Sequence, residues 1–105
     1  MYRIIRTAQV RGAGKLGEAI TWAKGTADYV SSQYPLVQVQ AYTQRFGTVG
    51  AIYWTIDVNS EDLAELDRFL TEIAQDAGYN ARVAEAAKND LFIPGSVQDI
   101  LLQSL

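Results

Sequence analysis

The run from Gly50 to Val58, which reads Gly-Ala-Ile-Tyr-Trp-Thr-Ile-Asp-Val, constrains the fold more than any other part of the chain. Its β-branched and aromatic residues are typical of a strand. Because successive side chains of a strand point to opposite faces, the bulky residues of this run divide between both faces. One face would carry Ile52, Trp54, Ile56 and Val58, and the other Ala51, Tyr53 and Thr55. A strand of this kind is predicted to lie in the middle of a sheet whose two faces are covered.

Hydrophobic periodicity predicts the other elements. Further strands are predicted over residues 2–10, 37–43 and 96–105. Helices are predicted over residues 15–34, from residues 59–62 onward, and, as a shorter segment, over residues 81–88. The buried stripe of the second helix is expected to comprise Leu63, Leu66, Leu70, Ile73 and Ala77, with Phe69 beside it. The element order is therefore strand, helix, strand, strand, helix, strand, with the short helix before the last strand.

The ends of these elements carry recognisable signals. Asn59 or Ser60 is the predicted N-cap of the second helix, because its side chain can accept a hydrogen bond from a free backbone N–H. Gly78 is the predicted residue just past the end of that helix. Arg45–Thr48 is predicted to form the turn of a hairpin that leads into the central strand.

This order predicts an α+β fold of the ferredoxin-like type, with the whole chain, residues 1–105, as one domain. The antiparallel sheet would have the strand order 4-1-3-2 and both main helices on one face. The other face would be bare and would carry Gln38, Gln40, Tyr42, Tyr53 and Thr55. Because an exposed face with aromatic residues needs a cover, we expect a homodimer in which two such faces meet.

Composition excludes several classes of function. The net charge is −3, the pI is about 4.7 and no basic run is present, so we expect no nucleic-acid partner. The chain has no cysteine and no histidine, which removes thiolate zinc sites, cysteine nucleophiles, Ser-His-Asp triads and histidine-ligated haem. No acidic cluster has the spacing of a calcium loop. We therefore predict no metal and no cofactor, no membrane span, and a cytoplasmic location.

Three stretches of the sequence resemble the NIPSNAP-like branch of the dimeric α+β-barrel superfamily. They are Tyr2–Thr7 with the turn that ends at Gly14-Lys15, the central strand with Trp54 followed by Ser60-Glu61-Asp62, and Phe92–Val97. The family commonly has proline where Ala13 stands and an aromatic residue where Ala8 stands. The resemblance implies two sheets that close face to face around a central cavity. It implies no single reaction, because the wider superfamily includes cofactor-free monooxygenases, haem enzymes, isomerases and stress-induced proteins.

Five residues are candidates for a ligand pocket: Arg6, Gln40, Tyr42, Tyr53 and Trp54. Tyr42 and Tyr53 share the polar parity with Gln40, where they would either line a cavity or pack between two sheets. Trp54 shares its parity with Ile52 and Ile56, which favours packing under the helices. Arg6 lies within a strand, where it would hold a ligand carboxylate or enolate, pair with Asp57 or another acid, or extend outward to solvent. The register of the strands decides between these alternatives.

Three functions fit these features. The first is a small-molecule-binding or accessory protein with no assigned reaction. The second is a cofactor-independent monooxygenase- or isomerase-like enzyme, acting on a small aromatic or polyketide-like substrate in a pocket of Tyr42, Tyr53 and Arg6. The third is a protein-interaction module. Trp22 and Tyr29 lie seven residues apart on one helix face, away from the main apolar stripe, where they would cover either a neighbouring segment or a protein partner.

Overall fold

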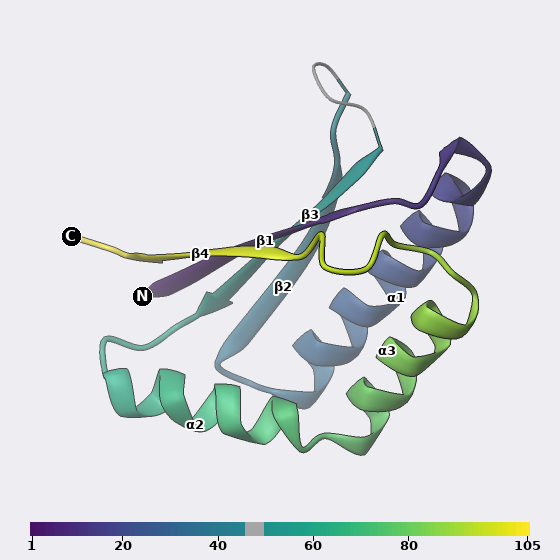
Figure 1. Cartoon of the computed structure of the whole chain (residues 1–105). Coiled ribbons are helices and arrows are strands. Elements are labelled where there is room, and N and C mark those ends of the chain that lie inside the picture. The colour runs from purple at the N-terminus through teal and green to yellow at the C-terminus, as the bar shows by residue number, and fades with distance from the viewer. Residues whose placement is uncertain (46–49) are drawn as a thin grey trace.

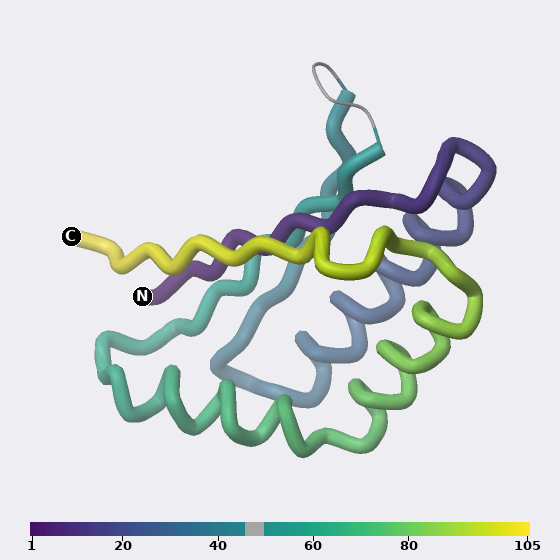
Figure 2. The backbone as a smooth tube through the Cα atoms, viewed as in Figure 1, coloured from purple at the N-terminus to yellow at the C-terminus, as the bar shows by residue number. Residues whose placement is uncertain are grey.

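A computed structural model describes residues 1–45 and 50–105, and it shows one sheet with helices on one of its faces (Figures 1 and 2). The strands are β1 (Tyr2–Gln9), β2 (Val37–Thr43), β3 (Ala51–Val58) and β4 (Gln98–Gln103). Adjacent strands pair antiparallel in the order β2-β3-β1-β4, which confirms the predicted ferredoxin-like order and the central place of β3. Of the predicted hairpin turn Arg45–Thr48, all but Arg45 lies outside the described residues.

The helical segments are a short 3-10 turn (Ala13–Lys15), α1 (Leu16–Gln33), α2 (Leu63–Ala74) and α3 (Ala77–Lys88). Within residues 1–45 and 50–105, none of the helices is long and apolar enough to cross a membrane. α1 lies along the sheet, α3 runs beside α1, and α2 crosses near the ends of the strands (Figure 1).

The predicted ends of the second helix are wrong in two respects. The N-cap of α2 is Asp62, which accepts a hydrogen bond from the Ala64 N–H at 2.9 Å, while Ser60 accepts one from the Asp62 N–H at 3.0 Å. Gly78 does not follow the helix but lies in the first turn of α3, which begins four residues before the predicted start at Ala81. The buried residues of α2 are Leu66 and Phe69, whereas Leu63 and Leu70 are exposed.

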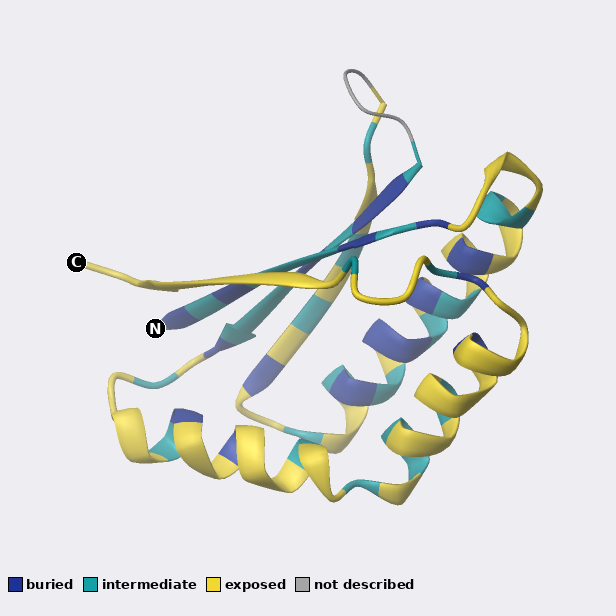
Figure 3. Ribbon diagram, in the orientation of Figure 1, coloured by how far each residue is buried: buried dark blue, intermediate teal, exposed yellow. Residues whose placement is uncertain are grey.

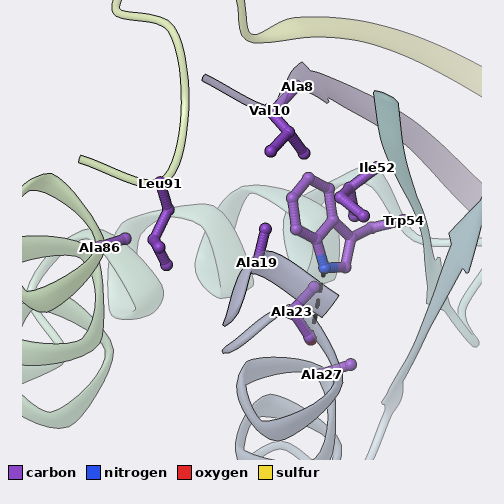
Figure 4. Close-up of a cluster of buried hydrophobic side chains, with 9 residues drawn as sticks. All are labelled: Ala8, Val10, Ala19, Ala23, Ala27, Ile52, Trp54, Ala86 and Leu91. Carbon is purple, nitrogen blue, oxygen red and sulfur yellow. Dashed lines mark hydrogen bonds between the residues drawn. The ribbon is translucent and has the colours of Figure 1, made fainter. Parts of the chain in front are cut away.

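Trp54 of β3 is the centre of the main core cluster (Figure 4). The facing side of α1 carries Ala19, Ala23 and Ala27, and these small side chains leave room for the indole between helix and sheet. The Trp54 Nε1–H donates a 3.4 Å hydrogen bond to the Ala23 carbonyl, drawn as a dashed line in Figure 4. Trp22 lies edge-on to Trp54, with ring centroids 6.3 Å apart. These contacts confirm the expectation that Trp54 packs under the helices.

The strand β4 is exposed along its whole length (Figure 3). It pairs with β1 on one side only, so its outer edge has no partner among the described strands. Ile100, Leu101 and Leu102 are exposed apolar residues within it. The described chain therefore leaves one sheet face and one apolar edge strand uncovered.

Candidate functional site

A pocket of about 90 Å³ lies between the helix-bearing face of the sheet and the three helices. Its wall is mostly apolar and aromatic, with three polar side chains. The apolar and aromatic residues are Ile4, Ala27, Val30, Val39, Trp54, Ile56, Phe69, Leu70 and Ile73. The polar residues are Arg6 from β1, Thr26 from α1 and Tyr79 from α3. A mostly apolar hollow with a few convergent polar groups is the usual form of a small-molecule site.

Arg6 is fixed by two partners. It lies opposite Asp99 of β4 in the antiparallel register. Its Nε–H and Nη2–H donate to the two Asp99 carboxylate oxygens at 2.8 and 2.9 Å, and its Nη1–H donates to the Tyr79 hydroxyl at 3.3 Å. The hydrogen bond with Asp99 raises the pKa of Arg6, and the same bond lowers the pKa of the Asp99 carboxyl. Of the sequence alternatives for Arg6, the structure shows pairing with another acid, Asp99.

The hydroxyl of Thr26 is buried, and it has no hydrogen-bond partner among the described residues. Thr26 is only 6% exposed, and it is the one buried polar residue of the described chain. A buried polar group without a partner destabilises a fold by about 1–3 kcal/mol. Such a group therefore calls for an explanation, and its place in the wall of the pocket offers one.

Tyr79 is held in place by Asp76, the N-cap of α3. The Asp76 Oδ1 accepts from the Tyr79 backbone N–H and from the Tyr29 hydroxyl, each at 2.8 Å. The other oxygen accepts from the Tyr34 hydroxyl at 2.7 Å. These bonds, led by the one from Tyr34, lower the pKa of Asp76. One carboxylate thus ties the start of α3 to α1, which sets the position of Tyr79 in the pocket.

The five predicted pocket residues divide between the two faces of the sheet. Arg6 and Trp54 line the pocket between sheet and helices. Gln40, Tyr42 and Tyr53 lie on the opposite, open face, as the pairing of Gln40 with Thr55 and of Tyr42 with Tyr53 shows. The structure therefore does not bring Arg6 together with the two tyrosines, because residues of opposite parity on adjacent strands cannot share a face.

The remaining polar residues of the pocket are not predictable from the sequence. Thr26 is one polar residue in an alanine-rich helix, and nothing in its neighbours marks it. Tyr79 falls in the segment just before the predicted start of the last helix. The only sequence signal for Tyr79 is that it lies just before the predicted helix start. This signal becomes informative only if Asp76 is recognised as the N-cap of the helix.

The open face has a regular arrangement that follows from the register. Arg3 pairs with Asp57 across β1 and β3, with a 2.7 Å bond from Nε to Oδ1 and a 2.9 Å bond from Nη2 to Oδ2. Ile5, Ile100 and Leu102 form an apolar patch beside this ion pair. The Tyr53 hydroxyl donates to Gln44 at 2.9 Å. This face therefore mixes satisfied polar groups with apolar ones.

The Trp22–Tyr29 face of α1, suggested as a protein-binding surface, is occupied by α3. The Trp22 Nε1–H donates to the Arg82 carbonyl at 2.8 Å, and the Arg82 guanidinium lies 5.4 Å from the centre of the Tyr29 ring. Trp22 also packs edge-on against Phe92. These two aromatic residues therefore cover a neighbouring segment of their own chain.

A second hollow, an open groove of about 620 Å³, runs between α1 and the edge strand β2, and the predicted pocket residues Gln40 and Tyr42 are part of its lining. Part of that edge is already occupied, because the Ser31 hydroxyl accepts from the Val39 N–H at 2.9 Å and donates to the Val39 carbonyl at 3.2 Å. Across residues 1–45 and 50–105, no group of three or more acidic residues is placed to hold a metal ion.

Solved structures share this architecture over nearly the whole chain. An uncharacterised NIPSNAP domain protein from Burkholderia xenovorans aligns with a TM-score of 0.75 and 16% identity, over 100% of this chain and 95% of its own. The chain has the fold of the dimeric α+β-barrel superfamily. A candidate antibiotic biosynthesis monooxygenase from Deinococcus radiodurans aligns with a TM-score of 0.74 and 10% identity, over 100% of this chain and 93% of that one.

Another structure of this fold is a single-residue mutant of SnoaB, a cofactor-independent oxygenase from Streptomyces nogalater. It aligns with a TM-score of 0.64 and 16% identity, over 98% of this chain and 91% of its own. No protein-family model matches the sequence, and comparison with curated proteins finds no match. At these identities the likeness shows the α+β fold of the chain, and the function has to be argued from the site, because one fold serves many functions.

Proposed function

We propose that this chain is a small-molecule-binding protein whose ligand occupies the pocket between the sheet and the helices. The observation that carries the proposal is the unpaired, buried hydroxyl of Thr26 in the wall of a hollow that also presents Arg6 and Tyr79. A ligand that accepts a hydrogen bond from Thr26 would satisfy this hydroxyl, while the apolar wall would bury the rest of the molecule.

NMR titration with a panel of small neutral, acidic and basic molecules tests the proposal. The chain has two tryptophans, and only Trp54 lines the pocket. We expect a binder to shift the Trp54 indole N–H signal more than that of Trp22. Leu70→Trp should fill the pocket and abolish the shift, because Leu70 lines it. Leu63→Trp is the control, since Leu63 lies on the same helix, is also exposed and does not line the pocket. A panel that leaves Trp54 unshifted, or a shift that survives Leu70→Trp, rejects the pocket.

We also propose that two copies of the chain associate through their open sheet faces. The exposed apolar residues Ile100 and Leu102 on this face, next to Ile5, support a partner there. A two-fold contact would use the same patch twice, so one apolar surface would cover another. The predicted small-molecule ligand and the dimer then use opposite faces of the sheet.

Adjacent residues of β4 provide a matched test of the dimer. Ile100 and Leu101 are 58% and 55% exposed, but Ile100 is on the open face and Leu101 on the helix-bearing face. Ile100→Glu should convert dimers to monomers in analytical ultracentrifugation, because it would bury a carboxylate in the interface. Leu101→Glu should leave the association state unchanged. Equal effects of both substitutions, or a monomeric unsubstituted protein, would contradict the face-to-face arrangement.

A second candidate function is a cofactor-independent oxygenase- or isomerase-like enzyme. It is favoured by the fold shared with SnoaB, which is described as a cofactor-independent oxygenase. Trp54 would then contact an electron-rich aromatic substrate, for which the pocket would have to open beyond its volume of about 90 Å³. Oxygen consumption in the presence of a naphthol, compared between the unsubstituted protein and Leu70→Trp, tests it: a rate equal to the buffer rate excludes this activity for that substrate. The small volume of the pocket favours the binding function over this one.

A further inference from the structure

We propose that the pocket between sheet and helices accepts a compact, uncharged molecule with a hydrogen-bond-accepting oxygen, and that Asp99 excludes carboxylates from it. This inference rests on the proposed binding function and names its class of ligand. It also assigns Asp99, which does not line the pocket, as the residue that sets the charge preference.

The charge of Arg6 is already neutralised. Asp99 engages Nε and Nη2 through both carboxylate oxygens, the two-point geometry in which arginine binds a carboxylate most strongly. A ligand carboxylate would have to replace Asp99 at both guanidinium nitrogens, or bind beside it against like-charge repulsion. Either route removes the advantage that a free guanidinium would give an anion.

Two residues of the wall carry hydroxyl groups whose protons have no acceptor among the described residues. Tyr79 accepts a bond from Arg6, so its own hydroxyl proton is left to donate, and the described residues give that proton no acceptor. The Thr26 hydroxyl has no partner of either kind among the same residues. Neutral donors of this type suit a carbonyl, ether or alcohol oxygen.

The rest of the wall restricts the body of the ligand. It consists of aliphatic side chains with the rings of Trp54 and Phe69, which favour an apolar body. An apolar cavity of about 150 Å³ is enough for a benzene molecule. A pocket of about 90 Å³ suits a smaller molecule, such as a short ketone.

Two probes of equal heavy-atom count, 2-butanone and propanoate, test the inference on the full-length protein. Both can accept hydrogen bonds, but only propanoate is charged at neutral pH. We expect 2-butanone to shift the Trp54 indole signal at millimolar concentration, as the small number of contacting atoms allows. Propanoate should bind at least several-fold more weakly at the same ionic strength.

Two substitutions separate the roles of the polar residues. Asp99→Asn frees the Arg6 charge, so propanoate should gain affinity and become the preferred probe. Thr26→Val removes the hydroxyl while preserving the shape of the side chain. It should weaken 2-butanone binding by about three- to tenfold, the value of one neutral hydrogen bond. Thr26→Val should also raise the melting temperature, because the unpaired polar group is gone. If Thr26 had no part in binding, its substitution would not both weaken 2-butanone binding and raise the melting temperature.

The possible outcomes have distinct meanings. Preferential binding of propanoate by the unsubstituted protein, or an unchanged preference in Asp99→Asn, would overturn this inference and leave the binding function in place. An unchanged 2-butanone affinity in Thr26→Val would also overturn it, because the hydroxyl would then pair with water or with nothing. If no probe of any charge shifts the Trp54 signal, the binding function itself fails and this inference fails with it.

Discussion

Gly78 lies where a side chain has no room. A Cβ at this position would meet the Tyr29 hydroxyl and lie 2.7 Å from the Tyr29 Cζ. The ring cannot retreat freely, because its hydroxyl is bonded to Asp76 and the Arg82 guanidinium lies over its face. The close approach of α3 to α1 therefore depends on this glycine.

Gly78→Ala should destabilise the protein, even though alanine is the better helix former by about 1 kcal/mol. The expected loss is about 1–3 kcal/mol, as for other overpacked sites. Gly17→Ala in α1 is the matched control, since nothing lies within 4 Å of a Cβ there, and it should stabilise the protein by about 0.5–1 kcal/mol. Urea unfolding of both variants measures these changes. If Gly78→Ala stabilised the protein instead, α3 would not lie as close to α1 in solution as the structure has it.

At the scale of elements, the edge strand β2 is protected by one side chain. Ser31 of α1 satisfies both outward-facing backbone groups of Val39. An unprotected edge is a template on which another chain can pair. Ser31 thus both ties β2 to α1 and limits strand addition.

Ser31→Ala should reduce the free energy of unfolding by about 1–2 kcal/mol, because two backbone groups lose their partner. It should also increase concentration-dependent association, measured by light scattering. Ser32→Ala is the control: its hydroxyl donates only to the Tyr29 carbonyl within the same helix, so we expect little change. Equal aggregation of the two variants would argue against edge protection.

Most strands and the strand order were predictable, because alternation and the short hairpin connection are local. The alternating run 37–43 matches β2 residue for residue. Apart from the N-cap of α2, the wrong element boundary lay in the segment 75–80, where Asp76 and Gly78 have two interpretations. A glycine after an apolar stripe suggests a helix end, but its contact with Tyr29 places it inside the next helix. In α2, the same spacing that predicted Leu70 as buried also permits the rotation that buries Phe69 instead.

The candidate site was less predictable, for reasons of register. The parity of Trp54 with its neighbours was enough to place it under the helices. Placing Arg6 would have required knowing its cross-strand partner. That partner is Asp99, which belongs to a strand about ninety residues further along the chain. Thr26 is distinguished only by the hydrogen bond that it lacks, and such an absence has no sequence signal.

For the whole molecule, paired groups set limits on stability at both ends of the pH range. The pKa values of Asp76 and Asp99 are lowered, chiefly by hydrogen bonds from Tyr34 and Arg6 respectively. Their contribution is full above about pH 4, near the unfolded pKa, and is lost as the pH falls through the folded values. Burial, then the bond to Asp76, raises the pKa of Tyr34 to about 12. Its contribution is full below about pH 10 and is lost as the pH rises through about 12.

Unfolding free energies measured across the pH range should therefore form a plateau that falls away below about pH 4 and above about pH 10. Tyr34→Phe should lower the plateau and flatten the alkaline fall, since the raised pKa is removed with the hydroxyl. Asp76→Asn should flatten part of the acid fall. An acid limb that is unchanged in Asp76→Asn would mean that this carboxyl does not couple folding to protonation.

The edge-on pair of Trp22 and Trp54 joins α1 to β3 across the main core, and both of the chain's indoles are in it. All tryptophan fluorescence of the protein therefore comes from the contact between the helix layer and the sheet. Motion of one layer against the other would change the coupling between the two rings before any strand separates. The fluorescence of the two tryptophans therefore reports the spacing between the helix layer and the sheet, without an added dye.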